Sequence, residues 1–264
     1  MNPLISLGCV GLLLSTVPGV TTVDLQPHTI AAFDRYIRDA EARLERQSHD
    51  PAFLWVDGSV ARKVRVRRGE VAAEPFSGNG DAGAPDGTIH DWVGAVFIPG
   101  ATLAKAIATA QDYDSEKAFY GPELQDSKTI RRDGGEFDIY LRLLKKQVII
   151  VVLNTNHRVN YFQLDSARWC SASHSTRIAE VQNPGEPDES EMEPGHDHGF
   201  LWRLNSYWRF EQRDGGVYVE CEAISLSRTV PVGFGWLVNP IVRTLPRDSL
   251  ANTLRSMRTA VMAR

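Results

Sequence analysis

The sequence predicts an α+β protein in which a curved antiparallel β-sheet wraps around a long C-terminal helix. Runs of alternating apolar and polar residues fill the middle of the chain, as expected of strands. Short turns separate these runs, so neighbouring strands should pair in sequence order. The last apolar residues recur at helical spacing, and such a helix must bury its apolar face against another layer. A sheet curved around this helix is the economical arrangement.

The composition is that of an ordinary globular protein. Apolar residues make up 42% and charged residues 23% of the 264 residues, and the formal net charge is −4. Nucleic-acid binding relies on a basic surface, which this balance does not supply, so we expect no nucleic-acid partner. The basic run RKVRVRR at 62–68 alternates with valine, which indicates the polar face of a strand within 60–75.

The N-terminus has the pattern of a secretion signal. Its apolar run extends from Leu4 to about Val17 and is too short and too interrupted for a good membrane span. We expect residues 1–22 to be a signal peptide, with cleavage after Gly19 or Thr22. The mature protein would then be periplasmic or secreted, with no integral membrane span after signal removal. An uncleaved anchor is the alternative.

The rest of the chain divides into an N-terminal helical extension, 23–60, and a domain, 61–264. Residues 27–48 form an amphipathic helix in this prediction, with four apolar residues near one face: Ile30, Phe33, Ile37 and Leu44. A strand over 60–75 and a glycine-rich loop follow.

The core begins with a strand from Ile89 that stops at Pro99-Gly100. Two short helices should follow it, ending near Gly121. The next predicted elements are strands at 123–132, 136–146, 148–161 and 168–181, an acidic loop at 182–199, and strands at 200–212 and 217–228. Asp214-Gly215-Gly216 between the last two is a strong hairpin signal. The final helix has apolar residues at helical spacing: Leu250, Leu254, Met257 and Val261.

This element order resembles the START-like, or polyketide-cyclase-like, helix-grip superfamily (SRPBCC), and specifically its bacterial, secreted members. The resemblance covers roughly 89–264 and is carried by VFIPGATLAKAIATAQDYDSEKAFYG near the start and WRFEQRDGGVYVECEAISLSRTVPVGFGWLVNPIV near the end. It implies an apolar cavity enclosed by the sheet and the final helix. The segment 24–88 and the secretion-like leader depart from the family pattern, which argues against an intracellular cyclase role.

Strand alternation then predicts which residues line that cavity. The apolar alternate faces carry a few polar groups, Thr155, His157 and Ser206, with Tyr161 as a further candidate. The expected ligand-binding residues are Ile139, Leu141, Val151, Leu153, Thr155, His157, Trp202, Leu204, Ser206, Trp208, Trp236, Ile241, Leu245 and Leu250. The same residues could instead fill a solid core.

The sequence offers weaker evidence for a metal site, a catalytic triad or a functional carboxylate pair. His196-Asp197-His198 offers too few converging ligands for a metal, so we expect a surface loop or a flap over the cavity, and no metal or cofactor. In Ser173-His174-Ser175 the histidine points away from both serines, which excludes a triad there. Glu220 and Glu222 share a strand face that we expect to be solvated.

The two cysteines left after signal removal, Cys170 and Cys221, should not form a disulfide. In the predicted strand order the 200–212 strand separates theirs, and two inter-strand spacings, about 9.6 Å, exceed the reach of a disulfide.

These features predict a protein that binds a hydrophobic small molecule or lipid, with no catalytic residue. The first alternative is a cyclase or dehydratase that uses His157 or a tyrosine as general acid/base in the same cavity. The second is an interaction protein with a filled core and the 24–88 extension as its contact surface. The sequence identifies no protein partner.

Overall fold

The computed structural model describes residues 21–146, 150–229 and 235–264, with side chains described from 246 onward in the last range. The expected signal peptide, 1–22, therefore lies almost entirely outside the described residues. Within them, no helix is both long enough and apolar enough to cross a membrane.

Five α-helices and two short 3-10 turns occur among the described residues. The helices are α1 (Pro27–Ser48), α2 (Val60–Arg67), α3 (Leu103–Ala110), α4 (Lys117–Tyr120) and α5 (Gly235–Ala263), and the turns are η1 (Trp55–Gly58) and η2 (Tyr113–Ser115). The long strands are β4 (Gly87–Pro99), β5 (Leu124–Asp133), β6 (Glu136–Lys146), β7 (Ile150–Gln163), β8 (Arg168–Gln182), β11 (Arg203–Arg213) and β12 (Gly216–Arg228). The short strands are β1 (Val23–Asp24), β2 (Ala72–Pro75), β3 (Asp81–Ala84), β9 (Ser190–Glu191) and β10 (His196–Asp197).

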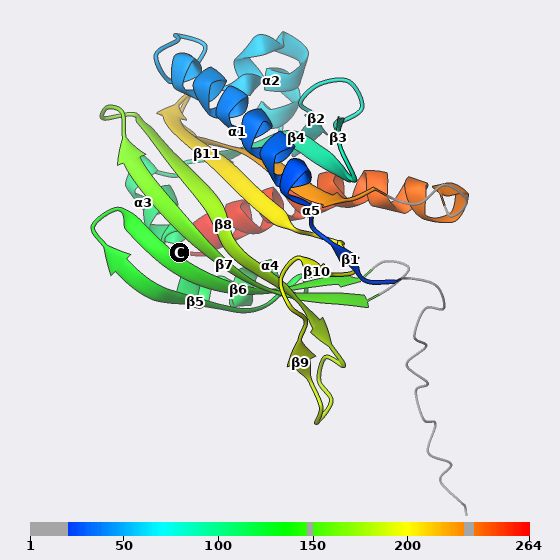
Figure 1. Ribbon diagram of the computed structural model, residues 1–264. Helices are drawn as coiled ribbons and strands as arrows, with labels where there is room; N and C mark the ends of the chain where they lie inside the picture. The colour runs from blue at the N-terminus through cyan, green and yellow to red at the C-terminus, as the bar shows by residue number, and fades with distance from the viewer. Residues whose placement is uncertain (1–20, 147–149, 230–234) are drawn as a thin grey trace, which may run out of the picture.

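The long strands and the short strand β2 form one curved antiparallel sheet in the order β2-β4-β12-β11-β8-β7-β6-β5 (Figure 1). Sequential strands pair as predicted, and β12 returns to pair with β4. The β11–β12 hairpin turns at Asp214 and Gly215, whose φ angles are +56° and +77°. Two consecutive positive φ angles are what a tight hairpin turn of this kind requires, so the Asp-Gly signal is confirmed.

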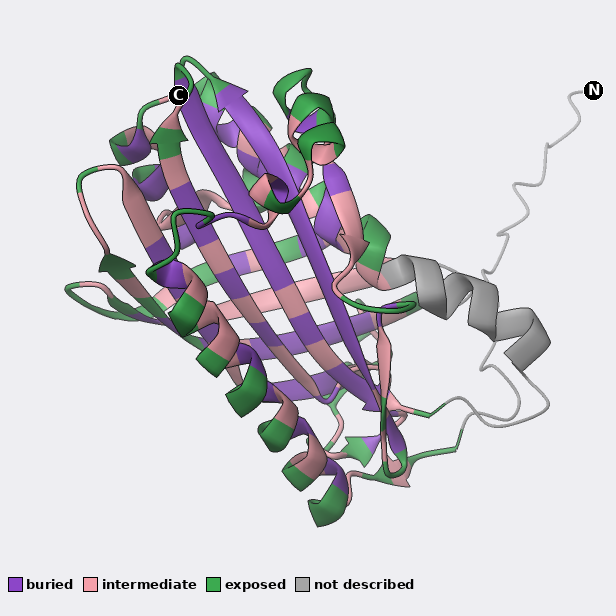
Figure 2. Cartoon of the chain, turned by 90° about the horizontal axis from the view of Figure 1, so that it is seen from above, coloured by how far each residue is buried: buried purple, intermediate pink, exposed green. Residues whose placement is uncertain are grey.

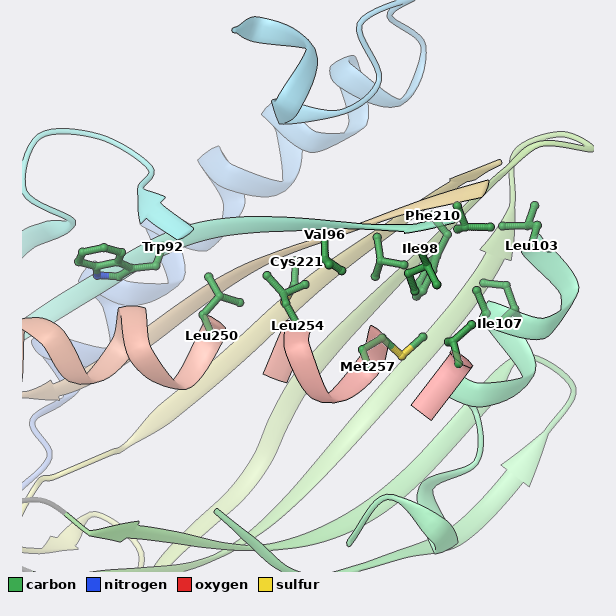
Figure 3. Close-up of a cluster of buried hydrophobic side chains, with 14 residues drawn as sticks. Trp92, Val96, Ile98, Leu103, Ile107, Phe210, Cys221, Leu250, Leu254 and Met257 are labelled. Carbon is green, nitrogen blue, oxygen red and sulfur yellow. The ribbon is translucent and has the colours of Figure 1, made fainter. Parts of the chain in front are cut away.

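The helix α5 lies on the concave face of the sheet, where it forms the main apolar core (Figure 3). All four residues expected on its apolar face, Leu250, Leu254, Met257 and Val261, are buried there. Gly94 on β4 permits the close approach. A Cβ at this position would lie 2.7 Å from Leu254 Cδ1 and 2.8 Å from the Ala72 carbonyl oxygen.

The N-terminal segment covers part of the opposite, convex face (Figures 1 and 2). The helix α1 has the predicted bounds, and its residues Phe33 and Ile37 pack with Ile89, Ile224 and other buried residues of the sheet. A second cluster packs Phe53, Leu54 and Val56, around η1, against β4 and β12. The extension is thus an integral layer of the fold.

The predicted strand over 60–75 is wrong in its first half. Residues Val60–Arg67 form α2, and only Ala72–Pro75 pair as a strand. The Ser59 hydroxyl accepts a hydrogen bond from the Arg62 N–H at 3.3 Å, which caps the helix. Val60 and Val64 are exposed while Val66 is buried, so the alternating valines do not mark one buried strand face.

The expectation that Glu220 and Glu222 face solvent is also wrong, because both are buried beneath the N-terminal segment. Glu220 accepts hydrogen bonds from the Trp55 N–H at 3.0 Å and from Arg209 at 3.0 Å. Glu222 binds both terminal nitrogens of Arg43 on α1, at 3.1 and 2.5 Å. A buried carboxylate requires such partners.

The cysteines are unpaired, as predicted. β11 lies between their strands. They also occupy different layers, since Cys170 packs with Phe53 on the convex side and Cys221 packs beneath α5 on the concave side.

Candidate ligand-binding site

The concave face of the sheet is unevenly covered. Among the sheet strands, the described residues of α5 pack mainly on β2, β4 and β12, and they also contact α3 and α4. On β11, Phe210 is fully buried in this core, whereas Trp208 and Leu204 on the same face are only partly buried. Leu141 on β6 and Val151 on β7 are likewise partly buried. An apolar surface that remains partly accessible faces the helix layer.

A polar stripe crosses this surface on β7, β8 and β11. His157 Nε2 lies 3.0 Å from Thr155 Oγ1, and its Nδ1 lies 3.5 Å from Ser173 Oγ. Ser173 is paired across strands with Ser206. Burial lowers the pKa of His157 to about 4, so its ring is neutral at physiological pH. The stripe offers hydrogen bonds and no charge.

A second polar group lies near the other end of β7. Tyr161 donates a hydrogen bond to the Ala110 carbonyl oxygen at 2.8 Å, and its own oxygen lies 2.8 Å from the Tyr113 hydroxyl. Phe137 packs edge-on against both rings, with centroid separations of 5.5 and 5.6 Å. These contacts connect the η2 turn to the sheet.

Most of the expected ligand-binding residues share the concave side. The strand register places Ile139, Leu141, Val151, Leu153, Thr155, His157, Leu204, Ser206 and Trp208 on it, and Leu250 reaches it from α5. Within this set, Leu250 belongs to the filled core under β4, and Ile139 packs with Phe137 and Tyr113. The side chains of Trp236, Ile241 and Leu245 lie outside the described residues.

Trp202 does not join the others. It packs with Phe33 and Ile37 of α1 on the convex side, and its indole N–H donates to Asp197 Oδ1 at 3.0 Å. The strand β11 begins at Arg203, so the alternation used to orient this stretch does not extend to residue 202. Trp202 instead lines an open hollow with Asp24, His28, Arg228 and neighbouring residues.

The His196-Asp197-His198 motif connects separate parts of the chain. His196 Nδ1 lies 2.5 Å from Asp24 Oδ1, while His198 Nδ1 lies 2.8 Å from Glu180 Oε2. The two rings thus have different partners, and nowhere in 21–146, 150–229 and 235–264 do three metal-binding side chains gather as a metal site would need. The segment forms β10, which pairs with β1 and holds the start of the described chain.

Sequence reasoning missed Ser173 as a site residue. His174 does point away from it, as predicted, and lies 2.7 Å from Glu41 on the convex side. The relevant partner is His157 on the adjacent strand. The register shift between Asn156 and His157 decides this pairing, and only the paired strands reveal it. Tyr113 and Glu116, in the helical connection after β4, carried no local signal at all.

Comparisons with known proteins found similarities to solved structures. No protein-family model matches the sequence, and no curated protein matches it. A STAR-related lipid transfer protein from Xanthomonas axonopodis is similar in structure, with a TM-score of 0.48 and 14% identity over 69% of this chain and 99% of its own. TTHA0849 from Thermus thermophilus has a TM-score of 0.46 and 16% identity, over 65% of this chain and 96% of its own. The Zhui aromatase/cyclase from a Streptomyces species has a TM-score of 0.38 and 12% identity, over 67% of this chain and 95% of its own.

The architecture is the helix-grip arrangement that the element order predicted: a curved antiparallel sheet, two short helices after the first long strand, and a long C-terminal helix on the concave face.

Proposed function

We propose that this protein binds a hydrophobic small molecule or lipid between the concave face of the sheet and α5, without a catalytic step. The observation that carries the proposal is the contrast along β11. Phe210 is fully buried under the helix layer, while Trp208 and Leu204, on the same face, keep accessible surface. Apolar surface that faces inward and remains accessible to water gains free energy when a ligand covers it.

The polar groups in this region suit such a ligand. Thr155, His157, Ser173 and Ser206 provide neutral donors and acceptors on an otherwise apolar floor. Burying an apolar molecule against them requires only that its few polar atoms find partners. An ionised group placed among them would lose hydration without gaining a counter-charge.

The direct test is native mass spectrometry of the chain purified without detergent, followed by extraction of bound small molecules. A stoichiometric apolar adduct is expected. Trp169 and Trp208 are partly buried and pack against the main core, so their fluorescence should change when the neutral dye Nile red binds.

A blocking variant makes the location testable. Ser206→Trp fills the middle of the concave face and should abolish Nile red binding, whereas Arg158→Trp, on the exposed face of β7, should not. Equal binding by both folded variants would place the dye elsewhere and contradict the proposal.

A second candidate function is a cyclase or dehydratase activity in the same space. The observation that favours it is the neutral His157, whose two ring nitrogens lie 3.0 and 3.5 Å from hydroxyl oxygens and could relay a proton. A His157→Ala variant that still binds the extracted molecule but no longer converts it would favour the enzyme. If the extracted molecule is added to the wild-type protein and recovered unchanged, simple binding is favoured.

A further inference from the structure

A cluster of polar side chains lies between the helical connection after β4 and the strands β7 and β8. Tyr161 on β7 and Ser171 on β8 face each other across the two strands. Tyr113 and Glu116 come from the η2 turn and its end, and Tyr120 from α4. The Tyr120 hydroxyl also lies 3.5 Å from Met257 Sδ on α5. The cluster is therefore located where the sheet, α4 and α5 meet.

The Glu116 carboxyl is deep within the protein, although the residue remains partly accessible. Loss of hydration, and then repulsion from the Asp112 charge, raise its pKa to about 8. The charge of the same carboxyl contributes to the raised pKa values of Tyr113, Tyr120 and Tyr161. Glu116, Tyr120 and Tyr161 nevertheless remain partly accessible. Groups that are both deep and accessible are able to contact a bound molecule.

Ser171 adds an unused hydrogen-bonding group. Its side chain is only 3% exposed, and its hydroxyl has no hydrogen-bond partner among the described residues. A buried hydroxyl without a partner is costly and uncommon in a native protein. Tyr161 donates to the Ala110 carbonyl, so its oxygen accepts the hydrogen bond from the Tyr113 hydroxyl and keeps one further lone pair as an acceptor. A ligand group that both donates and accepts would complete this arrangement.

No cation balances the cluster. Glu116 makes no ion pair with any residue in the described ranges. The two nearby basic side chains are engaged elsewhere, Lys117 with Asp126 at 3.0 Å and Arg264 with Asp112. An anionic head group would meet a carboxyl and tyrosine hydroxyls here with no counter-charge.

We propose that Glu116, Tyr120, Tyr161 and Ser171 form the polar end of the ligand site and select an uncharged hydroxyl or carbonyl group on an otherwise apolar molecule. The ligand class is then a neutral alcohol or ketone, and a fatty acid or a phosphate-bearing lipid is disfavoured. This inference depends on the proposed binding function, because the cluster acts on a ligand held by the concave face.

The test compares 1-hexadecanol with hexadecanoate as competitors of Nile red at neutral pH. These probes share a chain length and differ in the charge of the head group. The alcohol should displace the dye at a concentration about tenfold lower than the carboxylate, as expected when one of them loses hydration without a partner. Equal displacement, or a preference for the carboxylate, would overturn the inference.

Two conservative variants locate the preference. Tyr161→Phe and Ser171→Ala should each weaken hexadecanol binding about fivefold, the effect of one lost hydrogen bond. Ser171→Ala should not lower the melting temperature, because the hydroxyl it removes has no partner among the described residues of the folded chain. Tyr140→Phe is the matched control, since Tyr140 lies on the same sheet and donates to Asn154 on the outer face.

The outcomes separate the two proposals. If Nile red does not bind the wild-type protein, the binding function fails and the inference fails with it. If the dye and both probes bind, but Tyr161→Phe and Ser171→Ala behave like Tyr140→Phe, the binding function stands and the polar end is wrong. A preference for the alcohol that both variants remove supports the inference.

Discussion

The two faces of one sheet use opposite means of burial. The convex face, under α1, α2 and η1, holds two buried ion pairs, Arg209 with Glu220 and Arg43 with Glu222, and a carboxyl, Asp91, that accepts a hydrogen bond from Tyr36. The concave face, under α5, is built from apolar side chains with neutral polar groups, and part of it remains accessible.

This difference indicates which layer is structural. Each buried charge on the convex face has a specific partner in the covering segment, so that layer has one arrangement and is costly to displace. The accessible part of the concave face has apolar side chains with no such fixed partners, and it can exchange water for a ligand. The binding function is therefore expected on the concave side, and the N-terminal segment is expected to hold the sheet in shape.

The largest expected effect comes from breaking a covered ion pair. Arg209→Met should lower the free energy of unfolding by about 3–5 kcal/mol, because it leaves Glu220 buried without its cation. Arg158→Met is the matched control, an Arg paired with Asp138 on an uncovered part of the sheet, where its side chain is 60% exposed. That change should cost about 0–1 kcal/mol. Urea denaturation at mildly alkaline pH measures both, and similar losses would mean that the two regions are equally solvated.

A second comparison concerns the filled and accessible parts of the concave side. Leu254 is fully buried on α5, so Leu254→Ala should cost about 2.5–5 kcal/mol. Leu204 keeps accessible surface, so Leu204→Ala should cost only about 1 kcal/mol. Nile red affinity should fall in Leu204→Ala and stay unchanged in Leu254→Ala. The reverse pattern would identify the Leu204 region as packed core.

A third comparison concerns a dependence of stability on pH that originates on the convex face. Burial, and then repulsion from Glu222, raise the pKa of Asp91 from 3.8 to about 7. Between these values the folded state holds a proton that the unfolded state has released, so the stability that this group contributes is lost as pH rises toward about 7. Asp91→Asn removes this loss. A pKa shift from 3.8 to about 7 corresponds to about 4 kcal/mol, so relative to wild type the variant should gain up to about that amount across the window.

Urea denaturation of both proteins across the pH range measures this difference, and groups that titrate equally in the two proteins cancel. Asp138→Asn is the control. A hydrogen bond from Arg131 lowers the pKa of Asp138, so its contribution is lost as pH falls and the slope has the opposite sign. Parallel curves for Asp91→Asn and wild type would show that Asp91 is ionised throughout.

Local sequence patterns predicted most of the helices and strands, but they did not predict which residues are buried or what covers them. The α1 bounds, the Asp-Gly hairpin and the apolar face of α5 follow from spacing and turn chemistry, which act over a few residues. The misassigned strand over α2 shows the limit, because alternating valines fit either element and the Ser59 cap decided between them. Strand parity assigned nine concave residues to the correct face and failed at Trp202, which precedes its strand.

The sequence by itself determined the order of the elements, the antiparallel pairing of neighbouring strands and the separation of Cys170 from Cys221. Each depends on turns and on alternation along the chain. Only the tertiary structure decided that the N-terminal segment buries Glu220 and Glu222, and that His157 meets Ser173. The physical reason is that burial and side-chain pairing depend on which distant segment covers a face and on a one-residue shift in strand register. Periodicity within a single strand predicts neither the covering segment nor the register shift.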